Sequence, residues 1–335
     1  MTGATSTSTR DGGHTDPVTP RPLRLGTRAS TLALTQSTTV ARALERAVDR
    51  PVELVRIRTE GDRTRASLAG LGGTGVFAAA LREAVLAGRC DLAVHSLKDL
   101  PTAPTPGLVI GAVPERGDVR DVLCAREGWT LRTLPPGATV GTGSPRRAAQ
   151  LLAARPDLVV VDIRGNVETR LGRVRPGDLD AVVLAYAGLQ RVDRLGAVTD
   201  TLDPAVVVPA PGQGALAVEC RTADLDDPDH PLSTALPVLD HLPSRLAVTA
   251  ERAVLRTLEA GCAAPVGARA RVRDGVLHLH ATAVEPDGSR RLTHDARTPL
   301  PTGREAALAA ADTLGTDTAG VLLADGAATM TGRPG

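Results

Sequence analysis

The chain has 335 residues and a net charge of +1, from 39 Lys and Arg against 38 Asp and Glu. Balanced charge argues against a protein that coats nucleic acid, and three aromatic residues leave few side chains on which bases can stack. No apolar run approaches the roughly 18 residues of a membrane span, so we expect no membrane partner.

The composition is strongly skewed. Lys98 is the single lysine, Asn166 the single asparagine and Phe77 the single phenylalanine, while arginine supplies every other basic residue. Such a skew indicates a genome-wide preference for arginine over lysine. A rare residue that persists against this preference is therefore a candidate for a specific role.

The first 20 residues are rich in Ser, Thr, Gly and Pro and lack the apolar stretch of a signal peptide. We expect a disordered tail and a cytoplasmic protein. The cysteines lie far apart and form no CxxC pair, which predicts reduced thiols, with neither a disulfide framework nor a metal site. They are Cys90, Cys124, Cys220 and Cys262.

Strands and helices alternate in the first third of the chain, which predicts an α/β domain with a mostly parallel sheet. Ser30 is placed to cap a helix that continues to about residue 48. A glycine-rich loop at 68–75 precedes a second helix, which ends at Gly88. The expected strands are 23–26, 52–59, 91–96 and 108–114.

The alternation then repeats and predicts a second α/β domain. Ser144 and Pro145 stand in the preferred order of a cap and a first helical residue. The expected strands are 138–143, 158–164 and 180–186, with a helix at 167–174 between the last two. Residues 206–210 and 215–221 are interpreted as strands that return towards the first domain, and the polar, proline-rich 222–232 as a linker or surface loop.

The last part of the chain predicts a small α+β domain. A helix over 244–261 stops at Gly261, and a final helix covers 303–324. Between them, apolar and polar residues alternate, with Asp-Gly turns at 274–275 and 287–288, which predicts a three-stranded antiparallel sheet. The predicted division is a tail at 1–20, domain 1 at 21–114 and 211–232, domain 2 at 115–210, and domain 3 at 238–330.

Two strand-to-helix junctions carry the pattern of an anion site. GTRAS contains Arg28, and GTGSPRR contains Arg146 and Arg147. Such junctions direct free backbone N–H groups and a positive dipole end outwards, and arginine adds a fork for carboxylate or phosphate. Two of them in similar domains favour one anionic ligand held between the domains. The alternative is a pair of capped helices with exposed arginines.

The segment DLAVHSLKDLP delivers His95, Lys98 and Asp99 to the end of a strand, where open α/β sheets place their ligands. Lys98 is interpreted as an anion ligand or a Schiff-base nucleophile, and Asp99 as a group that stabilises a cation or accepts a proton. The alternative for this pair is a surface contact between lysine and aspartate. His95 is interpreted as a packed, hydrogen-bonded histidine.

Further segments complete the set of unusual features. IRGNVETRL supplies Arg164 and Arg170, AYAGLQR supplies Arg191, and VVPAPGQGAL shapes a crossover with prolines and glycines. Cys262 stands just past a helix end in LEAGCAAPVG, where a thiol is sterically open. Its activation needs nearby arginines, and from spacing alone a structural cysteine is the alternative.

Taken together, these segments resemble the porphobilinogen deaminase (hydroxymethylbilane synthase) family of the tetrapyrrole pathway. The resemblance runs from about residue 23 to 325 and includes LGTRASTLALTQ, TEGD, AVHSLKDLP, RPDLVVVDIRGNVETRL, LAYAGLQR, PAPGQGALAVECR and AERAVLRTLEAGCAAPVG. It implies two domains like those of periplasmic binding proteins around a central cleft, and a small third domain. The implied enzyme is a monomeric transferase. It polymerises four porphobilinogen molecules, with loss of ammonia, onto an enzyme-bound dipyrromethane, and it releases linear hydroxymethylbilane by hydrolysis.

The resemblance also implies residue roles. Cys262 would hold the dipyrromethane through a thioether, and Asp99 and Lys98 would be catalytic, with Asp99 binding pyrrole N–H groups and stabilising a developing cation. Cofactor-binding residues would be Arg28, Ser30, Lys98, Asp99, Ser144, Arg146, Arg147, Arg164 and Arg170. Substrate-binding residues would be Arg28, Phe77, Arg164, Arg170 and Arg191.

The chain departs from the family pattern at three places. Gly70 and Thr74 stand in the glycine-rich loop where many relatives have lysines, which puts a cationic lid in doubt. Pro145 replaces a usual leucine, and LEAGCAAP replaces LEGGCQVP around Cys262. Two other functions remain as alternatives: a non-catalytic anion-binding protein of the periplasmic type, and a Schiff-base lyase that uses Lys98.

Overall fold

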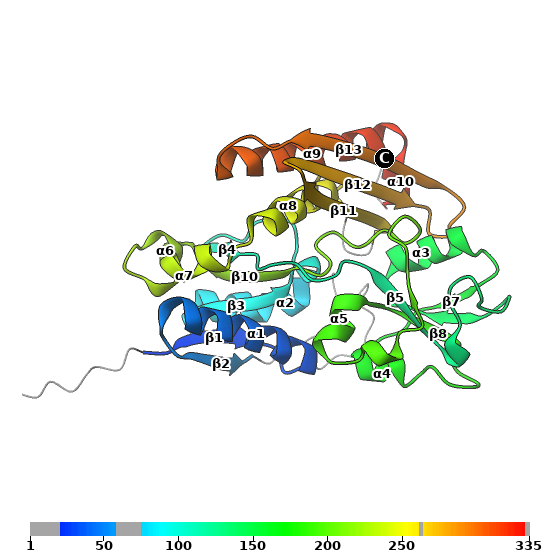
Figure 1. Ribbon diagram of the computed structural model, residues 1–335, viewed down its shortest axis with the longest axis horizontal. Helices are drawn as coiled ribbons and strands as arrows, with labels where there is room; N and C mark the ends of the chain where they lie inside the picture. The colour runs from blue at the N-terminus through cyan, green and yellow to red at the C-terminus, as the bar shows by residue number, and fades with distance from the viewer. Residues whose placement is uncertain (1–20, 58–74, 261–263, 332–335) are drawn as a thin grey trace, which may run out of the picture.

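The computed structural model describes residues 21–57, 75–260 and 264–331, and only the backbone of residues 75–77. The chain forms two five-stranded sheets and one three-stranded sheet, and Figure 1 shows the third sheet and its helices above the other two. Each sheet falls inside one of the three predicted domain ranges, although the boundaries themselves stay a prediction. None of the described helices is long and apolar enough to cross a membrane.

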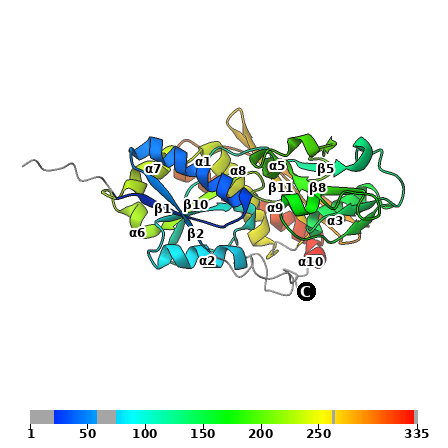
Figure 2. The same cartoon turned by 90° about the horizontal axis from the view of Figure 1, so that it is seen from below.

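The first sheet has the strand order β2-β1-β3-β10-β4, and only β10 runs against the others. Helices α1 and α2 lie on opposite faces of it (Figure 2). Its strands are β1 (Leu23–Thr27), β2 (Val52–Arg56), β3 (Leu92–Ser96), β4 (Leu108–Ala112) and β10 (Leu216–Arg221). Its helices are α1 (Thr31–Val48), α2 (Gly75–Leu86), α6 (Thr222–Asp226) and α7 (Pro231–Leu239), with a short turn η3 (Leu97–Asp99) after β3.

The second sheet repeats the arrangement in the order β7-β6-β8-β5-β9, with β5 antiparallel to both of its neighbours. Its strands are β5 (Asp121–Ala125), β6 (Thr139–Gly141), β7 (Val159–Val161), β8 (Ala181–Ala185) and β9 (Asp200–Thr201). Its helices are α3 (Pro145–Ala154), α4 (Val167–Leu171) and α5 (Tyr186–Arg191), with short turns η4 (Arg126–Gly128) and η5 (Leu195–Ala197).

The third sheet is an antiparallel meander whose one face packs on α8 and α9 through a core of alanine, leucine and valine. Alanine predominates in this core, which lets the two long helices approach the strands closely. The elements are α8 (Leu242–Thr257), β11 (Val266–Arg273), β12 (Val276–Val284), β13 (Arg291–Pro299), α9 (Arg304–Ala324) and α10 (Ala327–Met330). The predicted class, two α/β domains and a small α+β domain, is confirmed.

Three expectations about elements were wrong or incomplete. Residues 206–210 form no strand, because the side chains of Arg146 and Gln150 bond to Val208 in place of a neighbouring strand. Residues 222–232 are no linker: they form α6 and the start of α7, which packs on α1 through Leu232 and Leu236. Strand β5 was not predicted at all, although it lies between β8 and β9.

The chain passes between the first two sheets twice, once between β4 and β5 and once between β9 and β10. The passages contact each other where the Gly117 N–H donates to the Gly214 carbonyl at 3.3 Å. Gly214 has φ +84°, and a Cβ there would stand 2.6 Å from the Gly117 oxygen, so this crossing requires glycine. Glu251 of α8 joins both passages to the third sheet. It accepts hydrogen bonds from Arg116 at 2.7 and 2.8 Å, and from the Gly212 and Ala270 N–H groups at 2.7 Å each.

Two glycines of α9 provide a matched test of the packing between α8 and α9. A Cβ at Gly315 would collide with the Ala250 carbonyl and stand 2.6 Å from the Ala253 Cβ, whereas Gly320 faces open space. We expect Gly315→Ala to lower the free energy of unfolding by about 1–3 kcal/mol through overpacking. Gly320→Ala should raise it by about 0.5–1 kcal/mol, because alanine loses less backbone entropy in a helix. Urea denaturation of both variants measures the difference, and equal effects would contradict the packing described.

Candidate functional site

Helix starts stand at the ends of β1, β6 and β7, as the sequence predicts. The Ser30 hydroxyl accepts from the Ala33 N–H at 3.3 Å and caps α1, and the Ser144 hydroxyl accepts from the Arg147 N–H at 3.5 Å and caps α3. Asn166 caps α4 by accepting from the Thr169 N–H at 2.9 Å. Each cap leaves other backbone N–H groups of its first turn free for an anion.

The turn η3, which follows β3, holds Lys98 and Asp99 at the end of the first sheet. Leu97 anchors the turn, since its side chain is buried and its N–H donates to the Ala215 carbonyl at 3.0 Å. Arg252 of α8 donates to the Leu100 and Pro101 carbonyls at 2.9 and 2.7 Å. The turn is thereby fixed from the third domain, and Asp99 is left exposed.

Asp121, at the start of β5, is the fully buried carboxylate of the site. It pairs with Arg146 at 2.8 Å and with Arg147 at 2.7 Å, and it accepts from the Gln213 amide at 2.8 Å. Burial alone would raise the pKa of Asp121, but Arg146 and Arg147 outweigh this effect and hold the pKa well below its usual range. Two guanidinium groups share this one carboxylate, so the cluster keeps an excess of positive charge.

Gln213 connects this cluster to the single lysine. Its side-chain oxygen accepts from the half-buried Lys98 Nζ at 3.3 Å, while its amide donates to the Val119 carbonyl at 2.8 Å. Burial and then the neighbouring Arg147 lower the pKa of Lys98 to about 8, against the opposing effect of Asp99. The lysine ammonium of the first domain therefore lies in the field of the arginines of the second.

Arg164 and Arg170 extend the positive region from the second domain. Arg164 stands 3.3 Å from Asp162, and the Arg170 Nε donates to the Gly165 carbonyl at 2.8 Å. Burial and then the neighbouring Arg147 and Arg164 lower the pKa of Arg170. Asp99 favours the charged form of both Lys98 and Arg170, so its carboxylate lies in electrostatic reach of a cation from each α/β domain.

A cavity of about 80 Å³ opens beside this cluster, between α1, α2 and β3. Arg28, Ser30, Gln36, His95 and Asp99 contribute to its wall. The His95 ring itself is buried, with its Nε2 atom 3.3 Å from the Glu219 carboxylate. This agrees with the interpretation of His95 as a packed histidine.

The structure thus brings most of the predicted residues to one region, though in different states. Arg28, Lys98, Asp99, Arg164 and Arg170 are accessible at least in part. Arg146 and Arg147 are buried against Asp121. Arg191 donates to the Gly214 carbonyl at 2.7 Å and braces the crossing. Cys262, the TEGD segment, the glycine-rich loop at 68–74 and the tail at 1–20 lie outside the described residues, as does the side chain of Phe77.

Sequence reasoning missed the residues that position the site, namely Asp121, Gln213, Glu251 and Arg252. Gln213 stands in VVPAPGQGAL, one of the unusual segments of the sequence, and this is a usable signal for it. The acids carried no comparable signal, because Asp121 begins an unpredicted strand and Glu251 is one of several charges on a long helix.

Comparison with known proteins adds the family. The model "Porphobilinogen deaminase, dipyromethane cofactor binding domain" matches residues 23–227, and "Porphobilinogen deaminase, C-terminal domain" matches residues 245–323. The porphobilinogen deaminase of Thermobifida fusca is 63% identical over 270 residues, which cover 80% of this chain and 83% of that one. The porphobilinogen deaminase of Leifsonia xyli subsp. xyli is 56% identical over 309 residues, with 92% and 94% covered.

Among solved structures, the chain is similar to an ABC transporter periplasmic substrate-binding protein from Coxiella burnetii. The TM-score is 0.41 with 16% identity, over 65% of this chain and 91% of that one. The two family models together account for the three sheets described above, and the relatives match over most of their length. The chain belongs to the porphobilinogen deaminase family.

Proposed function

We propose that this chain polymerises four porphobilinogen molecules, with loss of ammonia, and releases linear hydroxymethylbilane by hydrolysis. The observation that carries the proposal is the cluster around Asp99, in which one exposed carboxylate lies within reach of cations from both α/β domains. Porphobilinogen brings two carboxylates per molecule, so a growing chain is a polyanion. A region that gathers more arginine and lysine than acid suits such a ligand.

The residues present fit the dipyrromethane of this family, which is the group that supplies the enzyme-bound pyrrole end for each addition. A dipyrromethane carries carboxylates, and burial followed by repulsion from neighbouring arginines lowers the pKa values of Lys98 and Arg170, so an added carboxylate would favour their charged forms. Arg28, Lys98, Arg164 and Arg170 would hold these carboxylates, together with the N–H groups at the starts of α1 and α3. Cys262 would carry the covalent link.

Each residue then has a physical role. The arginines orient carboxylates by paired hydrogen bonds, and Ser30 and Ser144 keep the helix starts in place. Asp99 accepts hydrogen bonds from pyrrole N–H groups and stabilises positive charge as ammonia departs. Fixed charge aimed at a developing charge is usually the largest single contribution to catalysis. Arg146 and Arg147 act through Asp121 and keep the local potential positive, and Arg191 and Phe77 complete the proposed substrate site.

We further propose that the enzyme works as a monomer in the cytoplasm. The described cysteines, Cys90, Cys124 and Cys220, are free and buried, which fits a reducing compartment. The large apolar side chains exposed on the described surface are scattered singly, as on monomeric proteins, rather than gathered in a patch.

Replacement of Asp99 tests the catalytic assignment. We expect Asp99→Asn to lower kcat by about 10²–10³-fold, because the variant cannot stabilise the developing positive charge. Asp99→Glu keeps the charge on a longer side chain and should lose less. Steady-state kinetics measure both variants, with the bound cofactor assayed alongside. A fully loaded Asp99→Asn enzyme with normal kcat would contradict the role.

The pH dependence tests Lys98. Its pKa is lowered to about 8 by burial, so its charge is present below that pH and is lost as the pH rises through it. We expect kcat/KM to fall along this alkaline limb, because a neutral amine no longer attracts carboxylate. Lys98→Arg stays charged and should lose the limb, even if its overall rate is lower. Profiles between about pH 6 and 10 decide the matter, and an identical limb in both enzymes would contradict the assignment.

The covalent link is tested by cysteine replacement. Acid treatment with Ehrlich's reagent should give the dipyrromethane colour with the wild type and none with Cys262→Ala. Cys124→Ala is the matched control and should keep the colour, because burial raises the pKa of Cys124 to about 11 and leaves that thiol unreactive. Intact-mass spectrometry that shows the bare polypeptide mass in active wild-type protein would overturn the link.

A further inference from the structure

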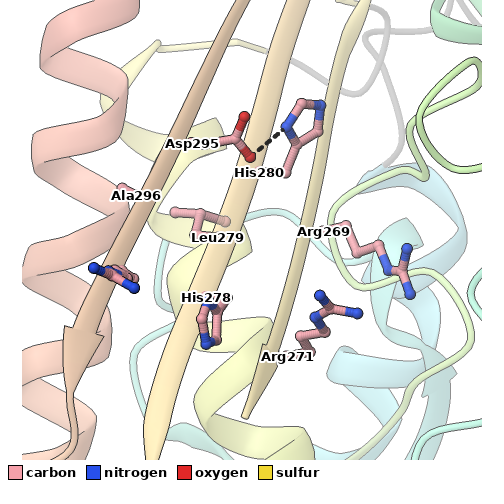
Figure 3. A pocket seen from close by; sticks show the side chains of 8 residues that line it. Arg269, Arg271, His278, Leu279, His280, Asp295 and Ala296 are labelled. Atoms are coloured by element: carbon pink, nitrogen blue, oxygen red, sulfur yellow. Dashed lines mark hydrogen bonds and ion pairs between the residues drawn. The ribbon is translucent and has the colours of Figure 1, made fainter. Parts of the chain in front are cut away.

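The outer face of the third sheet, opposite α8 and α9, contains a second and larger hollow. One end of this face is covered by the second domain, where Arg291 donates to the Ala205 and Val206 carbonyls at 3.0 and 3.2 Å. The rest forms an open cavity of about 410 Å³ (Figure 3). Its polar lining consists of Arg269, Arg271, His278, His280, Asp295 and Arg297.

Strand register places these side chains in two rows across the sheet. Arg271, His278 and Arg297 are directly opposite one another on β11, β12 and β13. Side chains in such positions stand roughly 5 Å apart at their Cβ atoms, and like charges there are destabilising. The two arginines of this row therefore stand on either side of His278, and no acid within the row offsets their charge.

The second row adds one acid, which is already engaged. The His280 Nδ1 and Asp295 Oδ1 atoms lie 2.8 Å apart, as the dashed line in Figure 3 shows. The other ring nitrogen, Nε2, is shielded from solvent and has no hydrogen-bond partner in the described part of the chain. Within that part, neither Arg271 nor Arg297 forms an ion pair.

Arg269 completes the positive wall, and Figure 3 shows it beside Arg271 on the same strand. Burial lowers its pKa, and the adjacent Arg271 and Arg116 lower it further. The acids that oppose this effect are Glu251 and Asp118. Both are committed elsewhere, Glu251 to Arg116 at 2.7 Å and Asp118 to Arg120 at 2.6 Å.

We propose that this hollow binds a small anion that carries two or more carboxylate or phosphate groups. Three arginines line it, and guanidinium groups bind both kinds of oxyanion in bidentate fashion. Its volume lies in the range of small-molecule pockets, about 300–1,000 Å³. The hollow shares no lining residue with the cluster around Lys98 and Asp99, so it does not depend on the function proposed above.

The test follows hydrogen exchange of backbone amides in residues 266–299 of the cofactor-loaded enzyme, during titration with pyrophosphate or citrate. Saturable protection is expected with at least one probe, and the effective probe identifies phosphate or carboxylate as the preferred group. In the double variant Arg271→Gln/Arg297→Gln, the half-saturating anion concentration should rise at least about tenfold. The loss of two charge-assisted hydrogen bonds would by itself cause a larger rise than this threshold.

Arg273→Gln is the matched control, because Arg273 lies on the same strand outside the hollow beside Asp274. It should bind within about twofold of the wild type, because Arg273 is exposed and already paired with Asp274. Removing repelling charges should not destabilise the double variant. If it fails to fold, Arg297→Gln alone on the edge strand replaces it, and its half-saturating concentration should still rise.

Three results would overturn the proposal: no protection by either probe, equal protection in the double variant, or equal protection by sodium chloride at matched ionic strength. Porphobilinogen turnover by the double variant is measured in parallel and should equal that of the wild type. Loss of anion protection with normal turnover supports the second site. The proposed anion site and the proposed function are therefore tested by separate measurements.

Discussion

A carboxylate removed from water must be paired, and the buried Glu251 meets this requirement with groups from three parts of the chain. Arg116 lies in the first passage between the α/β sheets, Gly212 in the second, and Ala270 in the third sheet. Removing one partner of such a pair typically costs about 3–5 kcal/mol, because a buried charge is left uncompensated. The third domain therefore holds the two chain passages between the first two sheets at a single point.

Asp121 is also a buried carboxylate that must be paired, but its surroundings keep an excess of positive charge. It is outnumbered by Arg146 and Arg147, and through Gln213 the imbalance reaches Lys98. Positive charges that repel one another oppose folding. The protein holds such charges in the region where a polycarboxylate would compensate them. The outer face of the third sheet shows the same conflict between folding and like charge, on a set of residues that is entirely separate.

The sequence alone predicted what depends on local chemistry. The caps at Ser30 and Ser144, the alternating strands of the third domain and the gathering of Arg28, Lys98 and Asp99 all follow from spacing and turn residues. What it could not predict depends on distant partners. The apolar run at 206–210 is typical of a strand, yet side chains of α3 satisfy its backbone. Asp121 is likewise 25 residues from Arg146, so no local pattern reveals the pair.

The single lysine has a consequence for handling the enzyme. Most proteins carry many exposed amines with pKa values above 10, and reagents that acylate amines modify them as a mixture. Here Lys98 is the one side-chain amine in 335 residues, and its pKa is lowered to about 8. At mildly alkaline pH half of it is already the nucleophilic free base. A fluorophore or cross-linker with amine chemistry would thus have a single side-chain target besides the α-amino group, and at that target it would report on the cluster around Lys98 and Asp99.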